Sequence, residues 1–181
     1  VKLIATGKNG CTDSATKEVK VWPQPASDFA MSKDSTCKEN TAVKFTDLSQ
    51  GARVTKWNLG NGVTTFQSNP KTTYDTTGTY DIKLMSKNRF GCHDTSYDQF
   101  KIHPPVEANF KPLSDLKGCQ PLDIRLKSNS KNAENLTWYI NGFKVGEGER
   151  LNTTVSRAGK YNITLEAESQ GGCKDTFKRK K

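Results

Sequence analysis

The chain has 181 residues, of which 33% are hydrophobic and 26% are charged, and 28 basic against 19 acidic residues give a formal net charge of +9. So little apolar material fits thin β domains better than the thick core of an α/β enzyme, and the length fits one large domain or two ordinary ones. The basic residues are spread along strand-like segments, apart from a run at 178–181, and they indicate a solvated surface with no nucleic-acid partner. No apolar run exceeds three residues, so we expect no insertion into a membrane.

The opening segment reads VKLIATGKNGCTD at 1–13 and is predicted to begin a pair of strands. We interpret residues 1–22 as the C-terminal strands of a preceding, truncated unit, because a lone hairpin is only marginally stable in water. The chain does not begin with Met, and we expect it to be a window on a longer array.

Residues 26–103 are predicted to form a complete unit of short strands. Apolar and polar residues alternate, as they do in strands that are buried on one face. The Asn-Gly dipeptide at 61–62 accepts positive φ and indicates a hairpin turn. The expected strands are ASDFAM (26–31), VKFTDLS (43–49), RVTKW (53–57), TYDIKL (79–84) and DQFKIH (98–103).

Residues 106–181 follow a joint marked by Pro104 and Pro105, and they repeat this order. A second Asn-Gly turn lies at 141–142, and the last strand is cut short, so the unit is nearly complete. Its expected strands are VEANF (106–110), LDIRLKS (122–128), NLTWY (135–139) and KYNITL (160–165).

The repeat has a period of about 81 residues. GTYDIKLMSKNRFGCHD at 78–94 is identical to GKYNITLEAESQGGCKD at 159–175 at seven of seventeen positions. The same spacing of 81 relates Trp57 to Trp138 and links Cys11, Cys92 and Cys173, while Cys37 and Cys119 are 82 apart.

The fold class that this pattern predicts is all-β, with tandem immunoglobulin-like β-sandwiches. About seven short strands and one central Trp per repeat are typical of that architecture. We predict that Trp57 and Trp138 fill the space between two sheets, and that Tyr80 and Tyr161 also lie in the cores.

The second unit resembles the PKD domain family along nearly its whole length. It has that family's order of motifs: a strand ending in Ser, WNLGNG at 57–62, an Asn-Pro…Tyr stretch at 69–74, and Gly-Thr-Tyr at 78–80 before an alternating strand. It departs by having Leu59 for the usual Phe and Asn61 for the usual Asp, and the third unit is more divergent.

The added cysteines, with Gly-Cys-x-Asp before the last strand, are similar to the PKD arrays of secreted Bacteroidota proteins. Many of those are adhesins or gliding-motility proteins exported by the type IX system. The resemblance implies tandem PKD-type sandwiches on the bacterial cell surface and no enzyme activity in the repeat. It also implies neighbouring repeats as partners, with surface polysaccharide or other cell-surface proteins as further partners.

Three short stretches are similar to the acceptor motif of the Bacteroidota O-glycosylation pathway, in which Asp precedes Ser or Thr. The hydroxyls that this likeness marks as candidate O-glycosylation sites are those of Ser14, Ser35 and Thr76.

Disulfides in an oxidising compartment explain the cysteines better than zinc does, because single cysteines separated by tens of residues do not form a zinc site. We favour the local pairings Cys37–Cys92 and Cys119–Cys173, which leave Cys11 with a partner outside the chain. Each would close a loop of about 55 residues and stabilise its unit by about 4 kcal/mol. Cys37–Cys173 stays open as the alternative, because in such a sandwich the first loop of one unit lies beside the last hairpin of the next.

The function we expect is a non-catalytic structural or adhesive segment of a large secreted cell-surface protein, acting as a semi-rigid stalk or spacer. No nucleophile, histidine and carboxylate set recurs and no Gly-rich phosphate loop is present, so neither an enzyme nor a cofactor is expected. Calcium is a weaker possibility, because turn capping explains its candidate ligands more economically. Those ligands are Asp47, Asp75, Asp81 and Asp94.

The alternative function is a carbohydrate-binding accessory module of a secreted hydrolase. Such a module needs exposed aromatic side chains in a row. The candidates lie in or near strands and turns, so we predict that they pack in the core instead; they are Phe66, Phe90, Tyr97 and Phe143.

Overall fold

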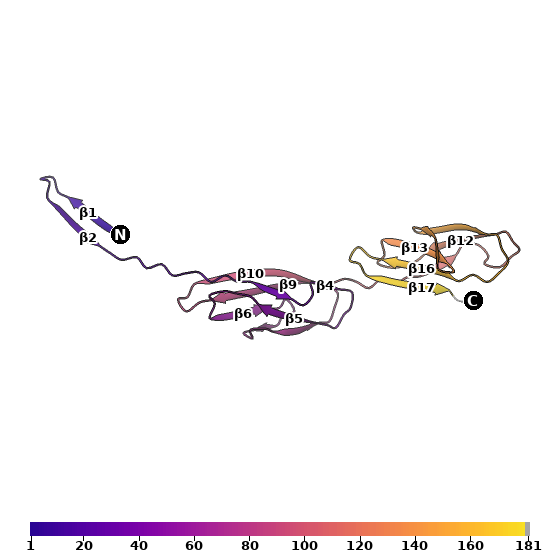
Figure 1. The fold of residues 1–181 in the computed structure, drawn as a ribbon, viewed down its shortest axis with the longest axis horizontal. Coiled ribbons are helices and arrows are strands. Elements are labelled where there is room, and N and C mark those ends of the chain that lie inside the picture. Colours follow the sequence, from indigo (N-terminus) through magenta and orange to yellow (C-terminus); the bar gives the residue numbers. More distant parts are fainter. Residues whose placement is uncertain (180–181) are drawn as a thin grey trace.

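Strands dominate the structure, a computed structural model that describes residues 1–179, and no helix is present within that range. The last two residues of the basic run at 178–181 lie outside the described residues. An exposed hairpin and two β-sandwiches follow one another along the long axis of the molecule (Figure 1). The predicted all-β sandwich fold is therefore confirmed. Consistent with the strand content, residues 1–179 provide no apolar helix long enough to cross a membrane.

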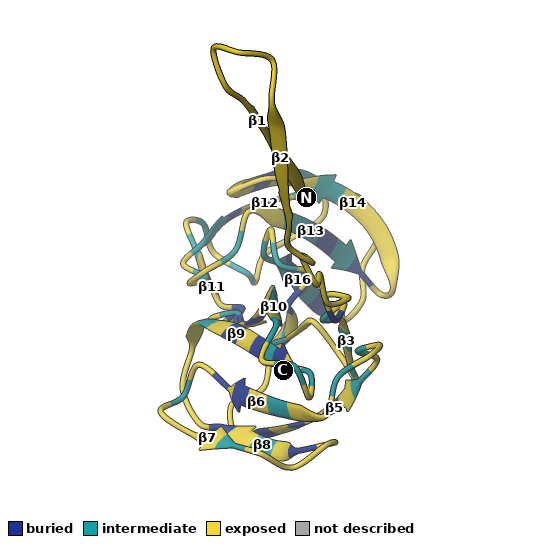
Figure 2. Cartoon of the chain, turned by 90° about the vertical axis from the view of Figure 1, so that its left-hand side faces the viewer, coloured by how far each residue is buried: buried dark blue, intermediate teal, exposed yellow. Residues whose placement is uncertain are grey.

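The opening hairpin consists of β1 (Lys2–Thr6) and β2 (Thr12–Thr16), which pair with each other from Lys2 opposite Thr16 to Thr6 opposite Thr12. Every residue of both strands is exposed. Figure 2 shows the hairpin projecting away from the sandwiches. The hairpin therefore buries no apolar face against another sheet.

Two sheets form the sandwich of the second unit. The smaller has the order β3-β5-β8, where β3 is Phe29–Met31, β5 is Thr41–Asp47 and β8 is Lys71–Tyr74. The larger has the order β4-β10-β9-β6-β7; its strands are β4 (Ser35–Thr36), β6 (Val54–Asn58), β7 (Thr64–Thr65), β9 (Gly78–Lys87) and β10 (His93–Ile102).

The core of the second unit lies around Trp57, which is fully buried, as predicted. Phe29 approaches its ring edge-on, with ring centroids 5.2 Å apart. Tyr74 is also fully buried, and its hydroxyl donates to the Leu59 carbonyl oxygen at 2.7 Å. Burial raises the pKa of the Tyr74 hydroxyl, so the group stays a neutral donor.

The third unit repeats the design with sheets of order β11-β12-β15 and β14-β13-β16-β17. Trp138 is fully buried, as predicted, and its Nε1 donates to the Gly148 carbonyl oxygen at 2.8 Å. The strands are β11 (Phe110–Pro112), β12 (Leu122–Ser128), β13 (Asn135–Ile140), β14 (Phe143–Glu147), β15 (Arg150–Val155), β16 (Ile163–Glu168) and β17 (Lys174–Arg179).

Tyr80 and Tyr161 lie at the edges of the two cores, where both are half-buried. The Tyr80 hydroxyl donates to the Thr76 carbonyl oxygen at 2.7 Å, and the Tyr161 hydroxyl donates to that of Arg157 at 2.9 Å. A tyrosine that bonds a few residues back along the backbone is the tyrosine corner of immunoglobulin-like sandwiches. These rings therefore pack against the core and fix a corner, whereas we expected them inside it.

Candidate functional site: a disulfide-bonded joint between two units

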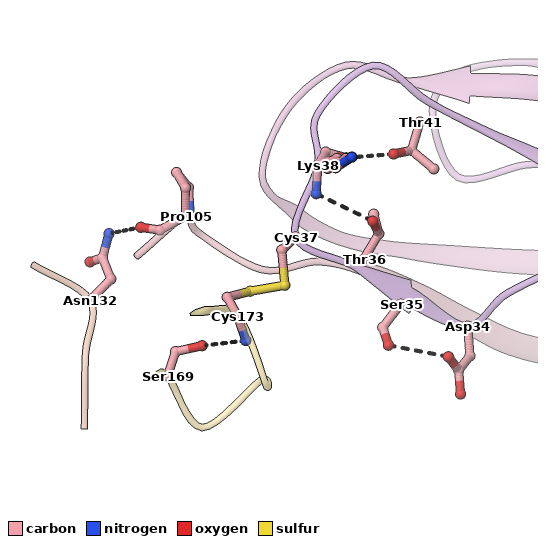
Figure 3. The surroundings of a disulfide bond; sticks show 10 residues. All are labelled: Asp34, Ser35, Thr36, Cys37, Lys38, Thr41, Pro105, Asn132, Ser169 and Cys173. Atoms are coloured by element: carbon pink, nitrogen blue, oxygen red, sulfur yellow. Dashed lines mark hydrogen bonds between the residues drawn. A yellow bond between two sulfur atoms is a disulfide. The ribbon is translucent and has the colours of Figure 1, made fainter. Parts of the chain in front are cut away.

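A disulfide joins Cys37 of the second unit to Cys173 of the third, with the two Cα atoms 5.6 Å apart and a sequence separation of 136 (Figure 3). The local pairings that we favoured are wrong, because Cys92 and Cys119 are not bonded to these partners. The structure has the alternative pairing between units. Cys11, Cys92 and Cys119 are free thiols, and Cys11 and Cys119 are exposed.

Strand β4 explains why the local pairing fails. It pairs in parallel with the end of β10, placing Ser35 opposite Lys101 and Thr36 opposite Ile102. Cys37 follows directly and so lies where the chain leaves the second unit. Cys92 lies in the turn between β9 and β10, at the other end of the ten-residue strand β10. A strand of that length spans roughly 33 Å, far beyond the reach of a disulfide.

The turn between β16 and β17 brings Cys173 back toward the second unit. The Ser169 amide donates to the Cys173 carbonyl oxygen at 2.9 Å, and the Gly172 amide donates to that of Ser169 at 3.0 Å. Gly172 has a φ of 75°, which glycine adopts without strain. The Cys173 amide also donates to Ser169 Oγ at 3.1 Å, as Figure 3 shows. Together these bonds fix the direction of the cysteine.

An apolar cluster surrounds the disulfide. Cys173 is only 2% exposed, and Cys37 is half-buried and packs against the same cluster. The buried members of the cluster are Val106, Ala108, Ala167 and Cys173. Because attack by a thiolate requires access to a sulfur atom, this burial shields the Cys173 side of the bond from reduction.

His103 and Gly171 make a second contact at the joint, which the sequence reasoning missed. A Cβ atom on Gly171 would lie 2.3 Å from His103 Nδ1, so glycine is required unless the imidazole moves. One repeat earlier, Trp22 and Phe90 occupy the equivalent positions, and their rings stack with centroids 3.9 Å apart and planes at 9°. The period of 81 between Trp22 and His103 was the signal that could have found this contact.

The Asp of the Gly-Cys-x-Asp motif holds the segment that enters each sandwich. Asp94 Oδ2 accepts a hydrogen bond from the Ser27 amide at 2.8 Å, and Asp175 Oδ2 accepts one from the Ala108 amide at 2.8 Å. The amides of Ser27 and then Thr95 lower the pKa of the Asp94 carboxyl. The motif therefore links the hairpin turn to the start of the same unit.

Two contacts fix the entry of the chain into the third unit. Asn132 Nδ2 donates to the Pro105 carbonyl oxygen at 2.8 Å (Figure 3). Lys131 Nζ lies 2.9 Å from Glu107 Oε2, and both side chains are largely exposed, so this ion pair contributes little by itself. The proline-marked joint is therefore held on the side of the third unit as well as by the disulfide.

The remaining predicted residues do not meet at one site. The candidate glycosylation residues Ser14, Ser35 and Thr76 are exposed, and their modification stays a prediction. Asp47 Oδ1 accepts from the Ser49 amide at 2.9 Å, which is a turn-capping contact. Within residues 1–179, no group of three or more metal-ligating side chains is gathered.

Three of the four candidate aromatics are exposed, so the prediction that they pack in the core is wrong for them. Phe66, Tyr97 and Phe143 are 67%, 69% and 77% exposed. Phe66 follows the two-residue strand β7, which is too short for alternation to reveal which face it occupies. The fourth candidate, Phe90, is half-buried under Trp22.

Phe66 and Tyr97 lie on the same outer face of the β4-β10-β9-β6-β7 sheet. Tyr97 is paired with Lys83, whose Nζ lies 5.5 Å from the tyrosine ring centroid. Lys83 is paired in turn with Asn58 of β6. Lys56 lies two residues before Asn58 on the same strand, and its Nζ lies 5.8 Å from the Phe66 ring centroid. Residues paired across strands point to one side of a sheet, so two aromatics and two lysines share this face.

The family model of the PKD domain matches residues 22–102. The PKD match covers the second unit, from the Trp22 linker to the end of β10. No curated protein matches the sequence.

Solved structures with partial likeness include two PKD1 domains. One is from the Vibrio cholerae metalloprotease PrtV, with 23% identity over 44% of this chain and 98% of that one, and a TM-score of 0.38. The other is from Vibrio anguillarum Epp, with 20% identity over 46% and 98%, and a TM-score of 0.40. The fibronectin(III)-like modules of Clostridium thermocellum CbhA align over 83% of this chain and 92% of theirs, with 12% identity and a TM-score of 0.48.

Proposed function

We propose that the chain is a structural segment of a secreted cell-surface protein, in which cross-linked β-sandwiches form a semi-rigid stalk. The observation that carries this proposal is the Cys37–Cys173 bond between two units. A joint between sandwiches is otherwise free to bend, because interfaces within a chain are small and polar by default. A covalent bond beside the Pro104-Pro105 linker removes much of that freedom.

The disulfide also changes how the segment responds to tension. When the two ends are pulled, force follows the covalent path from the N-terminal residues through Cys37 and Cys173 to β17. The residues between these cysteines form a closed loop that carries no tension. The buried residues of both Trp-centred cores lie in this loop, so they bear no tension while the disulfide is intact, whereas β3, β4 and β17 lie on the path of the force.

The same bond supports an extracellular location, because disulfides form and persist in oxidising compartments such as the cell exterior. The finer proposal is an adhesin or gliding-motility protein exported by the type IX system, and its support is the likeness of the cysteine-bearing repeats. Neighbouring repeats are the first partners, and the repeats themselves act without catalysis.

Joint stiffness tests this proposal. Dyes placed at the exposed positions Ser68→Cys and Ser156→Cys, in chains whose free cysteines are replaced by Ser, report the distance between the second and third units. We expect a narrow distance distribution in the bonded chain and a clearly broader one in the matched chain that also carries Cys37→Ser and Cys173→Ser. Equally broad distributions in both chains would overturn the proposal.

A second candidate function is binding of acidic polysaccharide by the second unit. The observation that favours it is the outer face that presents Phe66 and Tyr97 beside Lys56 and Lys83. Exposed rings stack on sugar faces, and lysines attract carboxylate or sulfate groups.

A glycan-binding screen with neutral and acidic polysaccharides tests this second candidate. We expect binding of acidic polysaccharide that weakens at least tenfold in Phe66→Ala and in Tyr97→Ala. The matched control is Phe143→Ala, which removes an equally exposed ring from the third unit and leaves binding unchanged. Absence of binding, or equal loss in the control, would exclude this role.

A further inference from the structure

Three hairpin turns of the chain have the same backbone geometry. In each, the amide of the first residue donates to the carbonyl oxygen of the cysteine four positions later: Gly7 to Cys11 at 2.8 Å, Asn88 to Cys92 at 3.0 Å, and Ser169 to Cys173 at 2.9 Å. In each, the residue before the cysteine is a glycine with positive φ. The turn that reaches Cys37 is therefore present in three copies, two of which carry a free thiol.

The first loops of the two sandwiches are also anchored alike. The Lys44 amide donates to Ser32 Oγ at 3.1 Å, and the Arg125 amide donates to Ser114 Oγ at 3.0 Å. The loop cysteine follows this serine at the same spacing in both units. Cys119 thus has the same place relative to the serine anchor as Cys37, although the described residues of the third unit contain no strand that corresponds to β4.

The two loop cysteines differ in their state. Cys37 is bonded to the hairpin turn of the following unit, whereas Cys119 is an exposed free thiol. Exposure alone does not show what a cysteine binds. Cys37, the equivalent residue in the same chain, does show the kind of partner, because it forms a disulfide with a cysteine of a hairpin turn. That partner is a Gly-Cys hairpin turn.

We infer that the loop carrying Cys119 is the free half of a second cross-link, which receives a Gly-Cys hairpin turn of another unit of this type. The inference rests on the proposed stalk function and extends it from one joint to a series. Cys92 and Cys11 are the corresponding hairpin halves, so each unit offers one loop cysteine toward its successor and one hairpin cysteine toward its predecessor.

The bond forms by thiol–disulfide exchange with a small disulfide such as oxidised glutathione. The Cys119 thiolate first attacks oxidised glutathione, which forms a mixed disulfide and releases one reduced glutathione. The hairpin thiolate then attacks the Cys119 sulfur, the bond to glutathione breaks, and a second reduced glutathione leaves. Two thiols are oxidised and one disulfide is reduced, so the electrons balance.

Two variants of the full chain test this inference, with a second copy as the source of the turn. The loop chain carries Cys11→Ser and Cys92→Ser and keeps Cys119, whereas the turn chain carries Cys92→Ser and Cys119→Ser and keeps Cys11. Cys11 is the suitable turn because it lies on the exposed β1–β2 hairpin. Equal amounts are mixed in a buffer of reduced and oxidised glutathione, and the cross-linked dimers are quantified by mass spectrometry.

We expect the loop–turn heterodimer to exceed the two homodimers together by at least tenfold. Random pairing gives only equal amounts of heterodimer and combined homodimers, and either that result or no dimer at all would overturn the inference. The control replaces the turn chain by one with Cys11→Ser, Cys92→Ser, Cys119→Ser and Ser14→Cys, which moves the thiol off the turn on the same hairpin and should pair at random. All variants keep Cys37–Cys173, so failure here leaves the stiffness experiment on that joint unaffected.

Discussion

Equivalent core positions of the two sandwiches differ in how their polar atoms are satisfied. Trp138 Nε1 has the Gly148 carbonyl oxygen as acceptor, whereas Trp57 Nε1 is buried without a hydrogen-bond partner among the described residues. Ser86 Oγ is also buried without a hydrogen-bond partner among the described residues. At the equivalent position the third unit has Ala167, which is fully buried and has no polar side-chain atom. An unsatisfied buried polar group costs about 1–3 kcal/mol.

Replacing Ser86 by Ala gives the second unit the residue that the third unit already has. We expect Ser86→Ala to raise the free energy of unfolding by about 1 kcal/mol, because the desolvated hydroxyl is removed and no hydrogen bond is lost. The reverse change, Ala167→Ser, should lower it by about 1–3 kcal/mol. Urea denaturation measures both, and a clear loss of stability in Ser86→Ala would contradict this account.

At the scale of elements, the Asp94 carboxylate ties β10 to the entry of the second unit through the Ser27 amide. The pKa of this carboxyl is lowered in the folded chain. Its contribution to the free energy of unfolding is therefore complete above the pKa of the unfolded chain, which is about 3.9. That contribution is lost as the pH falls through the folded pKa, because the protonated carboxyl binds the two amides less well.

We expect Asp94→Asn to destabilise the second unit at pH 7 and to match the wild type once the pH is well below about 3.9. Thermal unfolding of both chains across this pH range checks the convergence. Asp98→Asn is the control on the same strand, since the Asp98 carboxylate accepts from its neighbour Gln99 and not from the entry segment. A stability gap that stays constant with pH would show that Asp94 acts through something other than its charge.

The sandwich elements could be predicted from the sequence, because β5, β9 and β12 alternate clearly between buried and exposed residues. The disulfide pairing could not be predicted in the same way, because the direction of the first loop depends on β4. That strand has only two residues, which is too short to show an alternation of apolar and polar side chains. Tyr80 was predicted to lie inside the core, but the core position is filled by Tyr74, which lies on the facing sheet and is fully buried. The outward position of Phe66 was missed because β7, which precedes it, is equally short.

At the scale of the whole molecule, the joint turns two sandwiches into one mechanical element. The Cα atoms of Cys37 and Cys173 are 5.6 Å apart, although 136 residue steps separate them along the chain. In the chain-entropy description, closing so long a loop stabilises the folded state by about 5 kcal/mol. The main consequence is nevertheless mechanical, since the loop keeps both cores off the path of tension.

Single-molecule stretching of the chain between its two ends tests this claim most directly. With the disulfide intact, we expect extension to stop once the N-terminal segment up to Cys37 and strand β17 have been pulled out. The Cys37→Ser/Cys173→Ser chain should extend by about 450–490 Å more, the length of the released residues when stretched. The same final extension in both chains would mean that tension does not bypass the two cores.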